Sequence, residues 1–175
     1  MNFAIPTLET ERLILRAPKF EDFGPLSAFY ADDRSKFVKD GEMTPDKCWR
    51  TLAHIAGHWM LRGYGLFVLT LKGDDAPLGV AGAFHPIEHP ERELGWSLWA
   101  AEHEGHGYIT EAMIACRNYV YGTHKWTTAV SYIDPENTAS IKVAERLGCV
   151  LDETAKSPAN YPCLVYRHPA PEALS

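Results

Sequence analysis

The spacing of hydrophobic residues alternates between short apolar runs and longer stretches with one apolar face. The short runs are rich in Leu, Val, Ile and aromatic residues and end at glycine, proline or aspartate, which is typical of β-strands. Three of them follow one another with only turn residues between, and this order predicts an antiparallel meander. The predicted strands are Leu8–Arg16, Gly65–Leu71, Leu78–His85, Glu93–Trp99, Thr127–Tyr132, Cys149–Ala155 and Leu164–Arg167.

Apolar residues at helical spacing predict two helices between the first strand and this meander. A short helix follows Pro18. Thr44 and Pro45 supply an N-cap and a first-turn proline for a second helix, which ends near Arg62. Each helix is expected to bury its apolar face. These faces are Phe20, Phe23, Leu26, Ser27 and Tyr30 in the first helix, and Trp49, Leu52, Ala53, Ala56 and Met60 in the second.

Two further helices are predicted after the meander. The first has one buried face, because its apolar residues recur every three or four positions. The second runs from Asn137 to Leu147, and Gly148 is placed to end it in a left-handed cap. The apolar face of the first is Ile109, Ala112, Met113, Cys116, Tyr119 and Val120.

This order of elements predicts a single α/β (α+β) domain. Strands and helices follow one another as β-α-α-β-β-β-α-β-α-β-β. We expect a central mixed, mostly antiparallel sheet of six to seven strands with helices on both faces. The domain is expected to cover residues 1–168, and residues 169–175 to form a C-terminal tail.

Composition and charge narrow the function classes. The 175 residues carry a formal net charge of −6, which argues against a nucleic-acid partner because binding a duplex needs a basic surface. No stretch approaches about 18 apolar residues, so no membrane span is predicted, and no leader peptide is visible. The cysteines form no close pairs, so we expect no disulfide framework, no zinc site and a cytoplasmic location. They are Cys48, Cys116, Cys149 and Cys163.

Two histidines have a spacing that can place two ligands on one metal. His54 and His58 are four residues apart on the second predicted helix. They fall opposite its predicted apolar face, and no third ligand is evident. We therefore expect them on a solvated face, without a metal.

Glycines mark the segment between the meander and the third helix. Gly105 and Gly107 allow the backbone to turn its N–H groups toward a ligand, and the helix behind them adds unpaired N–H groups and the positive end of its dipole. This arrangement suits a phosphate or pyrophosphate. A turn that only connects a strand to a helix can carry the same glycines.

The segment Asn137–Cys149 reads NTASIKVAERLGC. It resembles the pattern N-x-x-S-x-(K/R)-x-x-E-(K/R)-L-G-F of the GNAT acetyltransferases. The glycine segment, followed by Thr-Glu-Ala at residues 110–112, resembles their acetyl-CoA loop. The opening Leu8–Arg16, LETERLILR, is similar to the start of the RimJ/RimL-like branch. Because the three motifs occur in the family's order, the chain is identified as a member of the GNAT superfamily.

The resemblance implies an enzyme that transfers the acetyl group of acetyl-CoA directly to a primary amine, with no covalent enzyme intermediate and no metal. The implied acceptor is either a protein N-terminus or a small-molecule amine, and the protein is expected to be a monomer or a homodimer. The segments that grip the acceptor in the family correspond to Asp32–Thr44 and Lys156–Pro162. These segments vary too much to name the acceptor.

The resemblance also assigns cofactor-binding residues. The strand before the glycine loop is expected to splay from its neighbour, so that its backbone groups bind the pantetheine arm and the thioester oxygen. Asn137 matches the asparagine that binds this arm, and it is equally suited to be a helix N-cap. The expected contacts are Ser97, Leu98 and Trp99 for the arm, and Gly105, His106, Gly107, Tyr108, Ile109 and Thr110 for the pyrophosphate.

Two residues are expected to act in the chemical step. Ser140 matches the serine near the sulfur and would protonate the departing thiolate. An alkyl ammonium with a pKa near ~10 must lose a proton before it attacks, and Glu93 is the expected base, acting directly or through a water. His85 is the alternative base, and Tyr166 in the last strand could also reach the cleft.

The chain departs from the family pattern in three places. Glu102 stands where the family usually has Gln or Arg, and Glu104 adds a second carboxylate near the expected pyrophosphate. These charges would weaken cofactor binding unless the side chains point to water, and they favour the alternative of a CoA-binding regulatory module without turnover. Cys149 replaces the usual phenylalanine, which we interpret as a core substitution.

Overall fold

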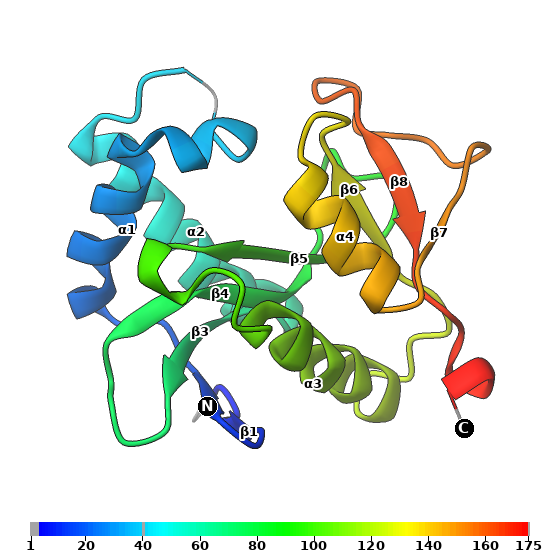
Figure 1. The fold of residues 1–175 in the computed structure, drawn as a ribbon, viewed down its shortest axis with the longest axis horizontal. Helices are drawn as coiled ribbons and strands as arrows, with labels where there is room; N and C mark the ends of the chain where they lie inside the picture. The colour runs from blue at the N-terminus through cyan, green and yellow to red at the C-terminus, as the bar shows by residue number, and fades with distance from the viewer. Residues whose placement is uncertain (1–3, 40, 175) are drawn as a thin grey trace.

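The computed structural model describes residues 4–39 and 41–174 (Figure 1). Residues 1–3 of the expected domain, Asp40 of the expected acceptor segment and Ser175 of the tail lie outside the described residues. In the described part, one sheet in the order β1-β2-β3-β4-β5-β6-β8-β7 has four α-helices on its two faces. The predicted α+β class and the mixed, mostly antiparallel sheet are confirmed. The sheet has eight strands rather than the six to seven expected.

The extra strand comes from the N-terminal segment. The predicted strand Leu8–Arg16 is two strands, β1 (Leu8–Glu9) and β2 (Leu13–Arg16), which pair antiparallel around a tight turn. Thr10 stabilises this turn, since its Oγ1 accepts the N–H of Leu13 at 3.0 Å. The polar residues of the turn resemble those of an exposed strand, so their spacing gave no sign of the reversal.

Helices α1 (Phe23–Ala31) and α2 (Pro45–Arg62) pack together on one face of the sheet. The predicted limits of α2 are confirmed. Oγ1 of Thr44 accepts the N–H of Lys47 at 3.3 Å, and Gly63, in the left-handed conformation with φ 77°, ends the helix.

The predicted buried faces of both helices need correction. Phe20 lies in a 3₁₀ turn before α1 and is 68% exposed, whereas Phe29 is buried. In α2, Trp49 and Met60 are exposed, and Trp49 packs edge-on against Phe20 and Phe23 instead. The residues that α2 buries are Cys48, Leu52, Ile55, His58 and Trp59.

Trp59 fixes the rotation of α2. Its ring is fully buried, and its Nε1–H donates to the carbonyl of Leu66 at 2.9 Å. The indole lies so close to the backbone that a Cβ on Gly65 would be 2.6 Å from it. Because α2 has apolar residues on more than one side, this contact, rather than their spacing, selects the buried face.

The three strands of the predicted meander pair antiparallel as expected. The N-terminal hairpin extends the sheet on one side of the meander, and the last three strands of the chain extend it on the other. The strand after the third helix begins later than predicted and runs parallel to the last strand of the meander. The two C-terminal strands pair antiparallel, and the first is shorter than predicted. The bounds are β3 (Leu66–Leu71), β4 (Pro77–Phe84), β5 (Glu93–Leu98), β6 (Val130–Ile133), β7 (Val150–Leu151) and β8 (Leu164–Arg167).

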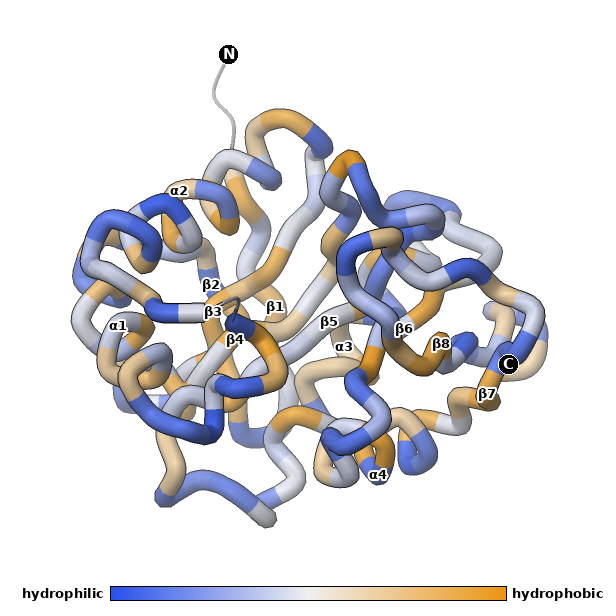
Figure 2. Tube along the Cα trace, turned by 90° about the horizontal axis from the view of Figure 1, so that it is seen from above, coloured by the Kyte–Doolittle hydropathy of each residue, from blue (hydrophilic) through white to orange (hydrophobic). Residues whose placement is uncertain are grey.

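Helices α3 (Tyr108–Gly122) and α4 (Thr138–Arg146) cover the opposite face. Gly148 is left-handed with φ 75°, as predicted, and Cys149 is buried in the core. Figure 2 shows that hydrophilic residues gather on outer turns and connecting loops. The predicted face of α3 is confirmed by the burial of Ile109, Ala112, Met113, Cys116 and Val120.

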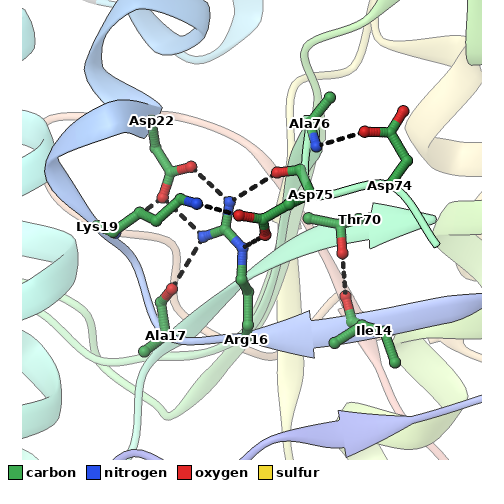
Figure 3. A network of polar contacts seen from close by, with 9 residues as sticks. All are labelled: Ile14, Arg16, Ala17, Lys19, Asp22, Thr70, Asp74, Asp75 and Ala76. Carbon is green, nitrogen blue, oxygen red and sulfur yellow. Dashed lines mark hydrogen bonds and ion pairs between the residues drawn. The ribbon is translucent and has the colours of Figure 1, made fainter. Parts of the chain in front are cut away.

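Arg16 at the end of β2 joins the first helical segment to the meander (Figure 3). Its guanidinium donates to both carboxylate oxygens of the fully buried Asp22, at 2.7 and 2.9 Å, and to Asp75 at 2.7 Å. Lys19 also binds Asp75, and together with Arg16 it lowers the pKa of that carboxyl. A buried carboxylate requires such a partner, so this network fixes the β3–β4 turn against α1.

Glu111, in the first turn of α3, is held by the β1–β2 turn. Its carboxylate accepts hydrogen bonds from Thr10 Oγ1 at 2.5 Å and from the backbone N–H and Nε of Arg12 at 2.9 and 2.7 Å. Burial raises the pKa of Glu111, but these hydrogen bonds outweigh it and the pKa is lowered. Two segments of family-like sequence, far apart in the chain, are therefore in direct contact.

Replacing Glu111 by alanine should destabilise the fold by about 1–3 kcal/mol, because three donors lose their acceptor. Urea unfolding at neutral pH measures the change. Glu145→Ala, at an exposed position of α4, is the matched control and should unfold like the unmodified protein. Equal midpoints for the two variants would contradict a structural role of the Glu111 contact.

Candidate active site

A cleft of about 710 Å³ opens between β5 and β6. The strands are parallel neighbours, but among the described residues their pairing is confined to Glu93 opposite Val130. Beyond this pair they diverge, and the edge of β5 that faces β6 is not paired in the sheet. Such an edge presents N–H and C=O groups to an extended ligand.

A buried side-chain bridge holds the point where the strands separate. The hydroxyl of Ser131 donates to the carbonyl of Leu94 at 2.6 Å and lies 2.9 Å from Nε2 of His168. Since the one hydroxyl proton goes to Leu94, Nε2 of His168 must donate to Ser131, and Nδ1 is unprotonated. Burial, aided by Arg117, lowers the pKa of His168 to about 3, so the ring is neutral.

The structure brings five of the predicted site residues to the wall of this cleft. Leu98 packs against the main core and does not line it. The predicted pyrophosphate residues, 105–110, also lie outside the cleft, where a surface loop opens onto α3. The five lining residues are Glu93, Ser97, Trp99, Asn137 and Ser140.

Glu93 lies at the narrow end of the cleft. Its carboxylate extends along β5, so that a Cβ on Gly95 would be 3.1 Å from Oε1. Oε2 lies 3.0 Å from Nδ1 of His89, which is an ion-pair distance, but the N–H does not point at the carboxylate well enough for a hydrogen bond. The expected base thus faces the cleft beside a titratable residue that the sequence analysis missed.

Trp99 cannot play the backbone role expected for it. Its N–H donates to the carbonyl of Leu78 at 2.7 Å, and its carbonyl accepts from Arg34 at 2.5 Å. Its indole N–H donates to Oγ of Ser97 at 3.0 Å. Because both backbone groups of Trp99 are engaged, and the carbonyl of Leu98 also accepts from Arg34 at 3.4 Å, the expected backbone contacts are reduced to those of Ser97 and the N–H of Leu98.

Asn137 and Ser140 occupy the start of α4 beside the cleft. Oδ1 of Asn137 accepts the N–H of Ser140 at 3.1 Å, so Asn137 is the N-cap of this helix. Both residues line the cleft. They are three positions apart and therefore share one face of the helix.

The glycine loop has the conformation that its sequence suggested. Gly105 and Gly107 both have left-handed backbones, with φ 77° and 78°, a region that favours glycine. The first helical hydrogen bond of α3 runs from Glu111 N–H to the carbonyl of Gly107, so the N–H groups before it have no partner within the helix. Arg12 donates to the carbonyl of His106 at 3.0 Å and adds a partly exposed cation beside the loop. These features suit an anion.

Glu104 forms an ion pair that offsets its negative charge near the glycine loop. Arg34, from the 3₁₀ helix η2 (Asp33–Phe37), lies 2.9 Å from Oε1 of Glu104. The same guanidinium contacts the carbonyl groups of Leu98 and Trp99 at the end of β5. Both loop glutamates are exposed, but Glu104 has Arg34 as an ion-pair partner, which it shares with Asp32.

The expectation of a solvated face for both histidines of α2 is wrong for His58. It is buried, its Nε2 accepts the N–H of His85 at 3.2 Å, and burial lowers its pKa to about 4. His54 is exposed and lines the cleft, whereas His85 and the buried Tyr166 do not line it. Across the described residues, no group of three or more His, Cys, Asp or Glu side chains is arranged to hold a metal ion.

Except for His89, which lies four positions from Glu93, the residues that the sequence analysis missed act through partners distant in the chain. Arg12 is part of the LETERLILR segment, which was the only available signal of its importance. Arg34, His89, Ser131 and His168 belong to no motif, and their roles depend on the residues that the fold places beside them.

Comparisons with known proteins place this geometry in context. Residues 12–150 match the family described as an acetyltransferase (GNAT) domain. The crystal structure of an acetyltransferase from Agrobacterium tumefaciens is 38% identical, covers 97% of each chain and superposes with a TM-score of 0.87. YkkB, an uncharacterized protein of Bacillus subtilis, is 38% identical over 109 residues, which are 60% of this chain and 62% of YkkB.

A more distant structure shares the fold alone. RimL, described as a ribosomal alpha-N-protein acetyltransferase in complex with coenzyme A, is 16% identical with a TM-score of 0.70. The match covers 93% of this chain and 96% of RimL. Separately, none of the helices in the described ranges is long and apolar enough to cross a membrane.

The buried neutral His168 predicts a loss of stability in acid. Its folded pKa, about 3, lies below the unfolded value near ~6.5, so between these values the unfolded chain binds a proton that the folded chain does not. Stability therefore falls as the pH falls, by roughly 2 kcal/mol from this residue between pH 7 and pH 5. Urea unfolding across this range measures the slope.

His168→Gln should flatten that slope, because the glutamine amide can still donate to Ser131 but does not titrate. The remaining slope should come from other buried histidines, such as His58, whose pKa is also lowered. A variant whose stability falls with pH as steeply as that of the unmodified protein would exclude His168 as the source.

Proposed function

The chain belongs to the GNAT family of N-acetyltransferases, and we propose that it transfers the acetyl group of acetyl-CoA to a primary amine bound in the cleft between β5 and β6. The observation that carries this proposal is the early divergence of these strands, which leaves one edge of β5 unpaired beside a glycine loop suited to an anion. Coenzyme A is bound by RimL, a relative of the same fold, which supports this cofactor.

The described residues fit acetyl-CoA at both ends. The diphosphate would lie on the N–H groups of Gly105–Thr110, near the cation of Arg12. The pantetheine arm would run along β5, past the backbone of Ser97 and the N–H of Leu98, and reach Asn137 at the start of α4. Acetyl-CoA supplies an activated acyl group as a thioester.

The proposed reaction is a single displacement. The neutral amine nitrogen attacks the thioester carbonyl, a C–N bond forms and the C–S bond breaks, and the sulfur leaves as a thiolate. Glu93 accepts the proton that the amine must lose, directly or through a water. Ser140 passes a proton to the thiolate while taking one from solvent, and β5 backbone N–H groups stabilise the negative charge on the carbonyl oxygen.

The alternative of a CoA-binding module without turnover was favoured by the two glutamates of the loop. Arg34, at 2.9 Å, offsets the charge of Glu104, whereas Glu102 stays exposed, so this feature is weakened. The proposed base and acid both line one cleft, which a purely binding protein does not require.

Release of free CoA from acetyl-CoA should depend on an added amine. Gly107→Val should abolish both this activity and the thermal shift with CoA, because a β-branched residue resists the left-handed backbone that exposes the loop N–H groups. Gly73→Val is the matched control: Gly73 is also left-handed, with φ 85°, but lies in the distant β3–β4 turn. CoA release that is indifferent to amines would refute the proposed function.

Ser140→Ala should lower turnover on the order of 10²-fold while leaving the CoA dissociation constant nearly unchanged, because only the acid is lost. Asn137→Ala should weaken CoA binding as well as turnover. Asn137→Asp separates the two roles of Asn137, since aspartate keeps the N-cap acceptor and loses the amide donor. Single-turnover rates and CoA titrations measure these effects. Unchanged chemistry in Ser140→Ala would assign the proton to another donor.

A further inference from the structure

A continuous row of four rings forms one wall of the cleft. His54 on α2 lies 5.2 Å from Phe84 at the end of β4, Phe84 lies 5.9 Å from His89, and His89 lies 5.1 Å from Tyr132 on β6. All four line the cleft, and they come from four separate segments. We call them the ring row. Because neighbouring rings of the row are tilted or edge-on, they offer both ring edges and ring faces, against which a further aromatic ring can pack.

The proposed base stands at the ring row. The carboxylate of Glu93 contacts His89 at 3.0 Å and extends along β5 over Gly95. An acceptor whose amino group approaches Glu93 therefore has its body beside these rings. The neighbouring groups partly desolvate the His54 ring, which lowers its pKa below the ordinary value, so this ring is neutral near neutral pH and does not repel an ammonium ion.

Two hydrogen bonds connect the segments that border the cleft. The hydroxyl of Tyr161 donates to the carbonyl of Phe37 at 3.2 Å, although the two residues are 124 positions apart. Nδ2 of Asn160 donates to Oε2 of Glu88 at 3.0 Å. All four residues of these two hydrogen bonds line the cleft: Phe37, Glu88, Asn160 and Tyr161. An acceptor long enough to leave the cleft between these segments would have to break these contacts, whereas a short one would not.

The two lysines that line the cleft contact groups of the nearby N-terminal segment. Nζ of Lys39 donates to the carbonyl groups of Tyr30 and Asp32, and Nζ of Lys36 lies 4.7 Å above the ring of Phe37. The charge nearest the proposed reacting end is therefore the carboxylate of Glu93. This arrangement favours an amine over an acidic acceptor.

We propose that the acceptor is a small primary amine with a flat aromatic body rather than the N-terminus of a protein. This inference rests on the proposed acetyltransferase function. The ring row binds the aromatic body, Glu93 takes the proton from the amino group, and the contacts of Tyr161 and Asn160 limit the acceptor's length. The products are the N-acetylated amine and CoA with a free thiol.

The first test compares four amines with the unmodified protein: 2-phenylethylamine, 2-cyclohexylethylamine, n-butylamine and a hexapeptide with a free N-terminal alanine. CoA release gives kcat/KM for each at one pH. The phenyl compound should exceed its cyclohexyl analogue of similar size by roughly two- to tenfold, the usual gain from aromatic pairing. It should exceed n-butylamine by about tenfold or more, because less apolar surface is buried by the butyl chain. The peptide should be the poorest acceptor.

Two variants assign these preferences to residues. Phe84→Leu should bring the phenyl-to-cyclohexyl ratio close to one, whereas Phe20→Leu, at an exposed ring outside the cleft, should keep the ratio of the unmodified protein. Tyr161→Phe removes only the hydroxyl and should raise kcat/KM for the peptide relative to phenylethylamine. Tyr121→Phe is its control, because Tyr121 makes a similar 3.0 Å hydrogen bond, to Pro169, outside the cleft.

The outcomes separate this inference from the function on which it rests. A peptide or a cyclohexyl amine preferred over the phenyl compound, with acetylation intact, overturns the acceptor class and leaves the acetyltransferase proposal standing. CoA binding without acetylation of any amine overturns both. The expected order of the four amines, together with the expected response of Phe84→Leu, supports the ring row as the acceptor site.

Discussion

The separation of β5 from β6 after one residue pair is the constraint on which the rest of the site depends. A parallel pair that continued along both strands would close the cleft and satisfy the groups that the cofactor is proposed to use. The strands diverge instead, and Ser131 supplies the carbonyl of Leu94 with a side-chain donor at 2.6 Å. The hydroxyl is in turn fixed by the neutral His168. The opening is therefore a stabilised feature of the core, since its buried carbonyl is hydrogen-bonded.

The two faces of the sheet serve different parts of the proposed reaction. On one face, the N-terminal hairpin holds the start of α3 through Thr10, Arg12 and Glu111, which fixes the glycine loop. On the other face, α2 and the end of β4 carry the ring row to the cleft. β5 lies between the two, so its residues contact both sides.

The effect of Glu104 on an anion bound at the glycine loop depends on a neighbour that only the fold supplies. Considered in the sequence alone, Glu104 is a departure from the family pattern that repels a diphosphate. In the fold, Arg34 lies against it and also contacts the end of β5. The carboxylate thus positions η2 beside the cleft, and its charge is compensated by a side chain 70 positions away.

The sequence by itself determined the features that depend on local geometry. The buried face of α3, the left-handed Gly105 and Gly107, and the N-cap of α4 follow from periodicity and backbone preference within a few residues. The class of fold and the family followed from the order of such elements.

Only the tertiary structure decided which of several apolar faces α2 buries, because the packing of Trp59 on Gly65 is a contact between elements. The same holds for the position of Arg34 beside Glu104 and for the bridge from Ser131 to His168. These groups become partners only when the chain brings distant segments within a few ångströms, and residue spacing contains no measure of that distance.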